Sequence, residues 1–350
     1  MKKILVTGAG GLIGSEVVRF FSNQNIEVIG IDNNMRRVFF GEKGDTTWNI
    51  SKLEQTYIQF KNFQIDIRNR EGIENFIKEQ KPDAIIHTAA QPSHDLAASM
   101  PYEDFDVNAV GTLNLLESTR RFSTQVPFVH LSTNKVYGDN PNKLRLVEHE
   151  TRYDYADTIY FNGIDENLSI DHCTHSLFGA SKLSSDILVQ EYGRYFNMPT
   201  CTLRGGCLTG PNHSGVELHG FLSYLIKCNV NEIEYKIYGY KGKQVRDNIH
   251  SYDVANFIYQ FIKQPKIGAV YNIGGGRENS ISILEAFKLI ESISGKKMKS
   301  TYIADNRIGD HICYISNLNK IKADYPDWNI TKNLKTTFLE IFNAWSRKEG

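Results

Sequence analysis

Three glycines at fixed spacing constrain the fold of this chain more than any other feature. Gly8, Gly11 and Gly14 form a G-x-x-G-x-x-G motif directly after the apolar run Lys3–Thr7, for which a buried strand is predicted. The first glycine allows a tight turn, and the second lets a pyrophosphate approach the backbone at the positive end of a helix. The third permits close packing of helix on strand, so the motif predicts a dinucleotide-binding turn.

An acidic residue closes the second predicted strand, Glu27–Asp32. Asp32 follows Gly14 by 18 residues, where a carboxylate accepts hydrogen bonds from the ribose hydroxyls of an adenosine. A carboxylate there repels a 2′-phosphate, so NAD is predicted as the cofactor. Arg36 and Arg37 lie close behind and keep NADP open as an alternative.

Predicted strands and helices alternate through the first 200 residues. Further strands are predicted at Phe63–Asp66, Ala84–Ala89 and Phe128–Ser132, and helices around residues 73–77 and from Pro101 to about Phe122. The alternation predicts an α/β fold, a doubly wound Rossmann parallel sheet covered by helices on both faces. The polar and aromatic stretch 33–60 fits poorly and is predicted to be a loop with a helical piece.

The pattern becomes irregular after about residue 200. Strands are predicted at Thr200–Arg204 and Ala269–Ile273, with helices around residues 254–262 and 283–290. We expect an NAD-binding Rossmann domain over residues 1–200, whose sheet is completed by later segments. Residues 201–350 are expected to form mainly a smaller C-terminal substrate-binding lobe.

Composition excludes several classes of protein. The 350 residues carry 40 basic and 40 acidic side chains, so no general attraction to nucleic acid or membrane is expected. No apolar run approaches the roughly 18 residues of a membrane span, and no signal peptide is predicted. The five cysteines contain no C-x-x-C pair, which favours free thiols in a reducing compartment. A soluble, cytoplasmic protein is predicted.

These residues resemble the extended short-chain dehydrogenase/reductase family, the nucleotide-sugar epimerases and dehydratases, over essentially the whole chain. Within it the chain most resembles the CDP-tyvelose (CDP-paratose) 2-epimerases. The motifs that carry this resemblance are Ser132–Asp139, Glu150–Tyr153, Gly163–Glu166 and Gly242–Asp247. The resemblance implies an NAD-dependent isomerase that epimerises a nucleotide-activated sugar, with a CDP-sugar favoured, in polysaccharide biosynthesis.

The resemblance also assigns roles to residues. Those implied to bind the cofactor are Gly8, Gly11, Leu12, Ile13, Gly14, Asp32, Asn33, Asp66, Ile67, Ala89, Ala90, Gln91, Asn108, Ser132 and Lys182. Those implied to bind the substrate are Asn134, Lys135, Cys207, Arg246 and Arg307. The two arginines suit the diphosphate of a sugar nucleotide, because a dianionic linker favours guanidinium forks.

Two pairs of residues separate this chain from its relatives. Similar 4,6-dehydratases have an acid pair after the Thr that corresponds to Thr133, whereas this chain has Asn134 and Lys135. Neither side chain can act as the carboxylic acid that expels water, so dehydration is not expected. Cys207 stands where the 2-epimerases have a substrate-contacting Asn, and Thr209 replaces a Tyr.

The catalytic helix of the family departs from its pattern at one position. Relatives carry a Tyr four residues before the Lys, which places a phenol and an ammonium on one helix face. Here Lys182 is present and Phe178 occupies the Tyr position. Thr133 is expected to hydrogen-bond the reacting oxygen, and Lys182 to fix the ribose. A phenyl ring cannot exchange a proton, so another group must act as the base if the chain is active.

Several groups could replace the phenol. Lys182 itself is one, because desolvation beside a cationic ring would lower its pKa. The others are His172, His175, Tyr160 and Cys207. His172, Cys173 and His175 match no standard zinc spacing, and no metal is predicted.

Two other functions and one assembly remain open. Phe178 is compatible with a protein that binds NAD and a sugar nucleotide without turning them over. Nothing in the residues excludes a net oxidoreductase that releases NADH. In the family, helices near residues 101–122 and 178–197 pair across a two-fold axis, so a homodimer is expected.

Overall fold

A computed structural model describes residues 1–213, 220–306 and 309–347, and the chain divides into two compact units. The first unit comprises Met1–Val136, Ser176–Arg204 and Val254–Tyr271, and the second comprises Tyr137–His175, Gly205–Asp253 and Asn272–Gly350. The division differs from a break near residue 200. The chain leaves the first unit at Tyr137 and re-enters it twice, because strands that complete its sheet come late in the sequence.

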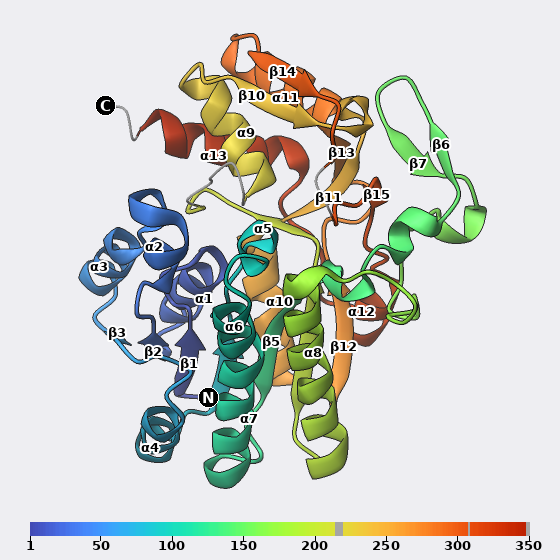
Figure 1. The fold of residues 1–350 in the computed structure, drawn as a ribbon. Coiled ribbons are helices and arrows are strands. Elements are labelled where there is room, and N and C mark those ends of the chain that lie inside the picture. The colour runs from blue at the N-terminus through green and yellow to red at the C-terminus, as the bar shows by residue number, and fades with distance from the viewer. Residues whose placement is uncertain (214–219, 307–308, 348–350) are drawn as a thin grey trace. The chain divides into compact units, whose positions relative to one another are not determined.

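Seven parallel strands form the sheet of the first unit, in the order β12-β8-β5-β4-β1-β2-β3 (Figure 1). Their bounds are β1 (Lys3–Thr7), β2 (Glu27–Ile31), β3 (Phe60–Phe63), β4 (Ala84–His87), β5 (Phe128–Thr133), β8 (Thr200–Gly205) and β12 (Ala269–Ile273). The chain runs outward from β1 to β3 and then returns to β4 on the other side of β1. The predicted doubly wound sheet is therefore confirmed, and its switch point lies between β1 and β4.

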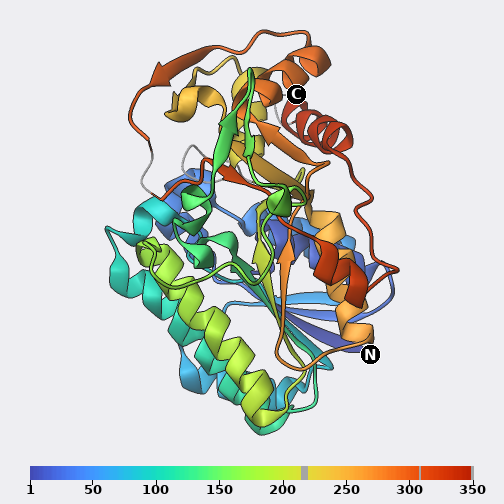
Figure 2. The same cartoon turned by 90° about the vertical axis from the view of Figure 1, so that its right-hand side faces the viewer.

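Helices cover both faces of this sheet (Figure 2). One face carries α4 (Arg70–Gln80), α7 (Gly111–Phe122) and α8 (Ser176–Phe196), and the other carries α1 (Leu12–Ser22) and α10 (Ser251–Lys263). Apolar strand residues such as Leu5 and Ile85 are buried against the first set in one continuous cluster. On the other face the rings of Phe21 and Tyr259 join α1 to α10, with centroids 5.8 Å apart.

Two predicted segments differ from the structure. The third strand is Phe60–Phe63 rather than Phe63–Asp66, because it pairs with β2 from Val28 to Ile31 and ends where β2 ends. Residues 33–60 hold α2 (Met35–Phe40), the 3-10 turn η1 (Gly41–Gly44) and α3 (Thr47–Thr56) rather than mainly a loop.

The helix predicted from Pro101 to Phe122 is interrupted by a wider turn. It consists of α6 (Pro101–Phe105), one π-helical turn η2 (Asp106–Val110) and α7. Pro101 occupies the first turn, where a missing N–H costs no helical hydrogen bond. Asn108 lies inside the π turn, a kind of irregularity that is frequent at functional sites.

The second unit has its own apolar core. It lies among α9 (Phe221–Val230), α11 (Ile283–Ser294), α13 (Leu334–Ser346), β10 (Tyr235–Tyr238) and β13 (Ser280–Ser282). The remaining elements of this unit are β6 (Leu146–Glu148), β7 (Tyr153–Tyr155), β9 (Cys207–Thr209), β11 (Val245–His250), β14 (Ser300–Ile303), β15 (Cys313–Tyr314) and α12 (Asn319–Asp324). Strand β11 joins β13, β15 and β9 into one small sheet. None of the helices within the described ranges is long and apolar enough to cross a membrane.

Candidate functional site

The turn after β1 has no room for side chains at two of its glycines. Gly8 has φ +69°, and a Cβ there would lie 2.8 Å from the backbone nitrogen of Ala89. A Cβ on Gly14 would lie 2.1 Å from the carbonyl oxygen of Gly8. Such distances exclude any larger residue, so both glycines are required for the close approach of β1, α1 and the loop after β4.

Helix α1 begins at this turn without a side-chain cap. Gly11 is its N-cap residue, and no side chain accepts from the first turn. The first amides of a helix, here including those of Leu12 and Ile13, have no acceptor within the helix and carry partial positive charge. This end of α1 therefore fits the pyrophosphate of a dinucleotide.

Asp32 lies beside the same turn. Its Oδ2 accepts a hydrogen bond from the backbone N–H of Gly10, and its Oδ1 accepts one from that of Asn34, both at 2.8 Å. Burial raises the pKa of the Asp32 carboxyl, and these two hydrogen bonds oppose the change. Asn33 is exposed between them. A ribose at the predicted place would meet this carboxylate at the carboxyl end of β2.

Helix α3 covers the middle of the glycine turn. The side-chain amide of Asn49 donates to the carbonyl oxygen of Gly10, and the Asn49 oxygen accepts from the Arg19 guanidinium at 2.7 Å. Asn49 is fully buried. Sequence reasoning missed this contact, because the residues that Asn49 meets are remote along the chain.

Asp66 and Ile67, which the resemblance implies to bind the cofactor, follow β3. The Asp66 carboxylate accepts hydrogen bonds from the Arg68 side chain, the shortest at 2.7 Å, and from the Arg68 backbone N–H at 2.9 Å. The Arg68 side chain is the main cause that lowers the pKa of Asp66. Ile67 is buried and lies against Gly111, where a Cβ would come within 2.6 Å of it.

Asn108 joins the loop after β4 to α6 and α8. Its Oδ1 accepts from the backbone N–H of Gln91 at 3.0 Å, and its amide nitrogen lies within bonding distance of the carbonyl oxygen of Gln91. The same nitrogen donates to Asp104 at 3.1 Å and to the Ser181 hydroxyl at 3.0 Å. Ala89 and Ala90, which precede Gln91, are therefore held at the carboxyl end of β4.

Ser132 and Thr133 end β5 and point to opposite sides, as adjacent strand residues do. The Ser132 hydroxyl donates to Asp186 at 2.6 Å, inside the protein. The Thr133 hydroxyl oxygen accepts from the backbone N–H of Lys135 at 3.2 Å. Asn134, predicted to contact substrate, is buried at the start of the turn η3 (Asn134–Tyr137).

Lys182 is buried on α8 with its amine against β5. The Nζ atom donates to the carbonyl oxygen of Leu131 at 2.8 Å and lies 3.4 Å from His130 Nε2. Burial lowers the pKa of Lys182 to about 8, although Asp186 and Asp104 act in the opposite direction. Phe178, one turn earlier on α8, is also buried.

Two buried histidines near Lys182, His87 and His130, were not predicted as site residues. The rings of His87 and His130 are 5.1 Å apart between centroids. His87 is held between the hydroxyls of Thr7, at 2.7 Å, and Thr112, at 2.9 Å. Burial lowers the pKa of His87 to about 3, so this ring is neutral at physiological pH. A single histidine in an apolar strand has no spacing signal that could have revealed it.

A buried ion pair supports the same helix. Arg204 on β8 contacts the Asp186 carboxylate at 3.0 Å, and both side chains are almost fully buried. Gln190 donates to the same oxygen of this carboxylate, Oδ1, at 2.6 Å. Asp186 follows Lys182 by one helical turn, so the pair fixes the part of α8 that carries the amine.

The substrate residues predicted after residue 200 lie in the second unit. Cys207 is on β9, which pairs with β11. Arg246 on β11 donates to the carbonyl oxygen of Val245 at 2.8 Å and lies 3.4 Å from the Asp310 carboxylate. Arg307 lies outside the described residues.

The predicted base candidates other than Lys182 also belong to the second unit. His175 Nε2 lies 2.8 Å from the carbonyl oxygen of Ile170 and 3.4 Å from Cys173 Sγ. His172 has φ +56° in a turn. Tyr160 ends a short 3-10 turn.

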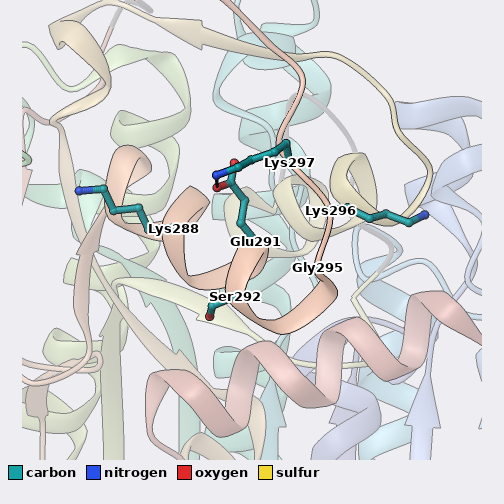
Figure 3. A pocket seen from close by; sticks show the side chains of 6 residues that line it. All are labelled: Lys288, Glu291, Ser292, Gly295, Lys296 and Lys297. Carbon is teal, nitrogen blue, oxygen red and sulfur yellow. Dashed lines mark hydrogen bonds and ion pairs between the residues drawn. The ribbon is translucent and has the colours of Figure 1, made fainter.

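A surface hollow lies at the C-terminal end of α11, in the second unit (Figure 3). Its side chains include Lys288, Glu291, Lys296 and Lys297. Lys297 forms an ion pair with Glu291 at 2.8 Å, and Figure 3 shows Lys288 and Lys296 pointing away from each other. These charged side chains do not converge on one point, so we assign no ligand to the hollow.

The sequence of this chain is similar to those of known proteins. Residues 4–274 match the model of the NAD dependent epimerase/dehydratase family. CDP-paratose 2-epimerase from Salmonella typhi is 33% identical over 349 residues, which cover 97% of this chain and 98% of that protein. A dTDP-glucose 4,6-dehydratase from Escherichia coli is 31% identical over 341 residues, with coverage of 92% and 87%.

Solved structures share the fold. A Tyr-to-Phe mutant of UDP-glucuronic acid 4-epimerase from Bacillus cereus, in complex with NAD and UDP-4-deoxy-4-fluoro-glucuronic acid, has a TM-score of 0.81 at 24% identity, covering 99% of each chain. The dTDP-glucose 4,6-dehydratase of Bacillus anthracis, in complex with NAD, has a TM-score of 0.77 at 24% identity, with coverage of 100% and 98%. The relatives are nucleotide-sugar epimerases and dehydratases, and the predicted resemblance is confirmed. With its glycine turn, its doubly wound sheet and a family match over most of its length, the chain belongs to the NAD-dependent epimerase/dehydratase family.

Proposed function

We propose that this protein is an NAD-dependent epimerase of a nucleotide-activated sugar, and that its substrate is a CDP-linked sugar. The observation that carries the proposal is the buried amine of Lys182. This amine donates to the carbonyl oxygen of Leu131 on β5, two residues before Thr133. A buried amine with a lowered pKa is what proton transfer near neutral pH requires. The preference for CDP rests on the similarity to CDP-paratose 2-epimerase.

The residues of the first unit fit NAD. The end of α1 suits the pyrophosphate, and Asp32 suits the adenosine ribose. Of the two arginines that kept NADP open, Arg37 forms ion pairs with Glu42 and with Asp45. Arg36 lies over the ring of Phe40, 4.7 Å from its centroid, and burial lowers its pKa to about 10. These contacts favour NAD over NADP.

We assign the base to Lys182. When bound, NAD supplies a hydride acceptor that can return the hydride to the same carbon. The neutral amine of Lys182 takes the proton of the sugar hydroxyl as the carbon loses its hydride, and it returns that proton when the hydride comes back. The Thr133 hydroxyl hydrogen-bonds the reacting oxygen, and Ser132 is already occupied by Asp186.

Dehydration is disfavoured by the residues that follow Thr133. Asn134 and Lys135 carry no carboxyl group, so neither can protonate a leaving hydroxide as a carboxylic acid does. This chemistry separates the chain from the dehydratases among its relatives. Arg246 is the residue we assign to the sugar nucleotide diphosphate, with Arg307 as its expected companion.

We also propose a homodimer. Exposed apolar side chains lie along α6 and α8, which contact each other in the first unit. They are Tyr102, Phe105, Leu177, Ile187, Tyr195 and Phe196. Exposed apolar side chains on two neighbouring helices suit a self-complementary contact across a two-fold axis. Light scattering tests the assembly, and a Tyr195→Lys chain should be monomeric.

The activity is tested by incubating the purified protein and NAD with CDP-sugars and other nucleotide sugars. Inversion at C2, followed by NMR, with retention of a C2 deuterium label is expected for one of them. Thr133→Val should reduce the rate by about 100-fold without loss of NAD binding. Binding of both NAD and a sugar nucleotide without inversion in any sugar would contradict the proposal.

Phe178 favours a second candidate, a protein that binds both ligands without turnover. The Phe178→Tyr chain separates the two. Turnover only in the tyrosine variant would support the binding protein, whereas turnover in the native chain supports an adapted site. Accumulation of free NADH during turnover would instead indicate a net oxidoreductase.

A further inference from the structure

His130 lies between the amine of Lys182 and the hydroxyl of Ser185. Its Nε2 atom is 3.1 Å from Ser185 Oγ and 3.4 Å from Lys182 Nζ. The ring is fully buried on β5. Its other nitrogen, Nδ1, is buried and has no hydrogen-bond partner among the described residues.

The position of the ring hydrogen follows from counting donors. Ser185 has one hydroxyl hydrogen, which it donates to the carbonyl oxygen of Lys182 at 2.8 Å. Ser185 therefore offers only a lone pair to His130, and a bond between them needs the hydrogen on Nε2. The other tautomer would bury an N–H group with no acceptor, which is costly. The structure thus favours His130 with its hydrogen on Nε2.

The Nε2 atom donates its hydrogen to Ser185 and so has no lone pair for the Lys182 amine, which lies 3.4 Å away. An ammonium group has three hydrogens and no lone pair, so it would find no acceptor at His130. A neutral amine has a lone pair to turn toward His130 and still donates to Leu131. The acids that face Lys182, Asp186 and Asp104, favour the ammonium instead. His87, the other titratable group beside His130, is neutral.

We propose that His130 is a positioning residue which, with its tautomer fixed by Ser185, holds Lys182 in the neutral amine form that accepts the substrate proton. The inference rests on the proposed function, in which Lys182 is the base. A Tyr-Lys pair would otherwise activate the proton acceptor. Here we assign that activation to Lys182 and Ser185 on α8 together with His130 on β5. His130 is fully buried and acts through Lys182.

The tautomer can be measured on the unmodified chain without substrate. Protein labelled with ¹⁵N-histidine is examined by long-range ¹H–¹⁵N NMR at neutral pH, and the His130→Gln chain identifies the resonance. We expect the His130 pattern of a hydrogen on Nε2. A hydrogen on Nδ1, or an imidazolium, would overturn the proposal.

The effect on Lys182 is measured by titrating protein labelled with ¹³C at lysine Cε. We expect a midpoint near pH 8 in the native chain. Ser185→Ala removes the hydroxyl that accepts from Nε2, so the Nε2–H tautomer loses its bond and the Nδ1–H tautomer, which can accept from the ammonium, becomes accessible. The midpoint should then rise by at least one pH unit, which is tenfold in the proton equilibrium. An unchanged midpoint would refute the role of Ser185 and His130.

Ser184→Ala is the matched control. Ser184 is half-buried on the same helix and donates to the carbonyl oxygen of Ala180 at 2.9 Å, so its replacement loses a similar bond away from the amine. Its midpoint should equal that of the native chain. Both NMR measurements need no turnover, so they can hold where the epimerase assay fails. A native chain that is active while Lys182 titrates unshifted would instead keep the epimerase activity and reject both this inference and the assignment of Lys182 as the base.

Discussion

The side-chain nitrogen of Asn49 lies 3.0 Å from the carbonyl oxygen of Gly10 and donates a hydrogen bond to it. Asn49 belongs to α3, in the stretch between β2 and β3, and Gly10 is the middle of the turn that we assign to the cofactor. From α1, the Arg19 guanidinium donates to the side-chain oxygen of Asn49. Helix α3 contributes no strand to the sheet, yet through Asn49 it helps to hold the glycine turn in place.

Asn49→Ala should weaken NAD binding about 3- to 10-fold, because one hydrogen bond to the turn contributes roughly 0.5–1.5 kcal/mol. Isothermal titration of the variant with NAD measures the change. Gln55→Ala, at an exposed position of the same helix, should bind NAD like the native chain. A lower melting temperature with unchanged NAD affinity would mean that Asn49 supports only the fold.

Asp32→Asn should lower the affinity for NAD by about 10- to 150-fold, since hydrogen bonds to a charged group contribute about 1.5–3 kcal/mol. The affinity for NADP should fall less, because the repulsion between a carboxylate and a 2′-phosphate disappears with the charge. Parallel titrations with the two cofactors give the ratio. Glu27→Gln, at the exposed start of β2, is the control, and a ratio that stays the same in both variants would argue against a selective role for Asp32.

Arg204→Met should destabilise the protein by about 3–5 kcal/mol, because it leaves the buried Asp186 carboxylate without its cation. Urea unfolding measures the loss. Arg194→Met removes an exposed ion pair with Glu191 and should change the stability by less than about 1 kcal/mol. Equal losses in the two variants would show that the buried pair contributes no more than a surface pair.

Acid should unfold the protein partly through His87. Its folded pKa of about 3 lies below the ordinary value of 6.5, so between these values the unfolded chain binds a proton that the folded chain does not. Stability therefore falls as the pH falls, by about 1.4 kcal/mol per pH unit for one such group.

Urea unfolding between pH 6.5 and pH 5 checks this dependence. The slope should be shallower in His87→Gln by about the contribution of one proton. His149→Gln, at an exposed position, is the matched control. A His87→Gln chain with the native slope would show that His87 is not buried neutral.

Local patterns predicted the parts of the fold that local forces determine. Lys3–Thr7 and Ala269–Ile273 were predicted with the bounds that the structure shows, because a short apolar run bounded by turn residues favours a buried strand. The glycine turn followed from its position between strand and helix. The family match and the sheet order confirm these predictions.

Contacts between distant residues were not predictable in the same way. The third strand stops where its neighbour β2 stops, so its bounds depend on pairing rather than on its own residues. Helix α3 buries Asn49, a polar residue whose partners are remote along the chain. His130 and Ser185 become meaningful only when α8 lies on β5, and no motif joins them in the sequence.

The π turn Asp106–Val110 has a consequence for how this chain can vary. A π turn places one more residue in the helix than an α turn does, and Asn108 lies within it. Removing one residue here would restore a regular helix, yet each α-helical residue adds about 100° of rotation, which would carry Asn108 away from Gln91 and Ser181. Single-residue deletions from 106 to 110 should therefore be among the least tolerated in the protein, even though they would make the helix more ideal.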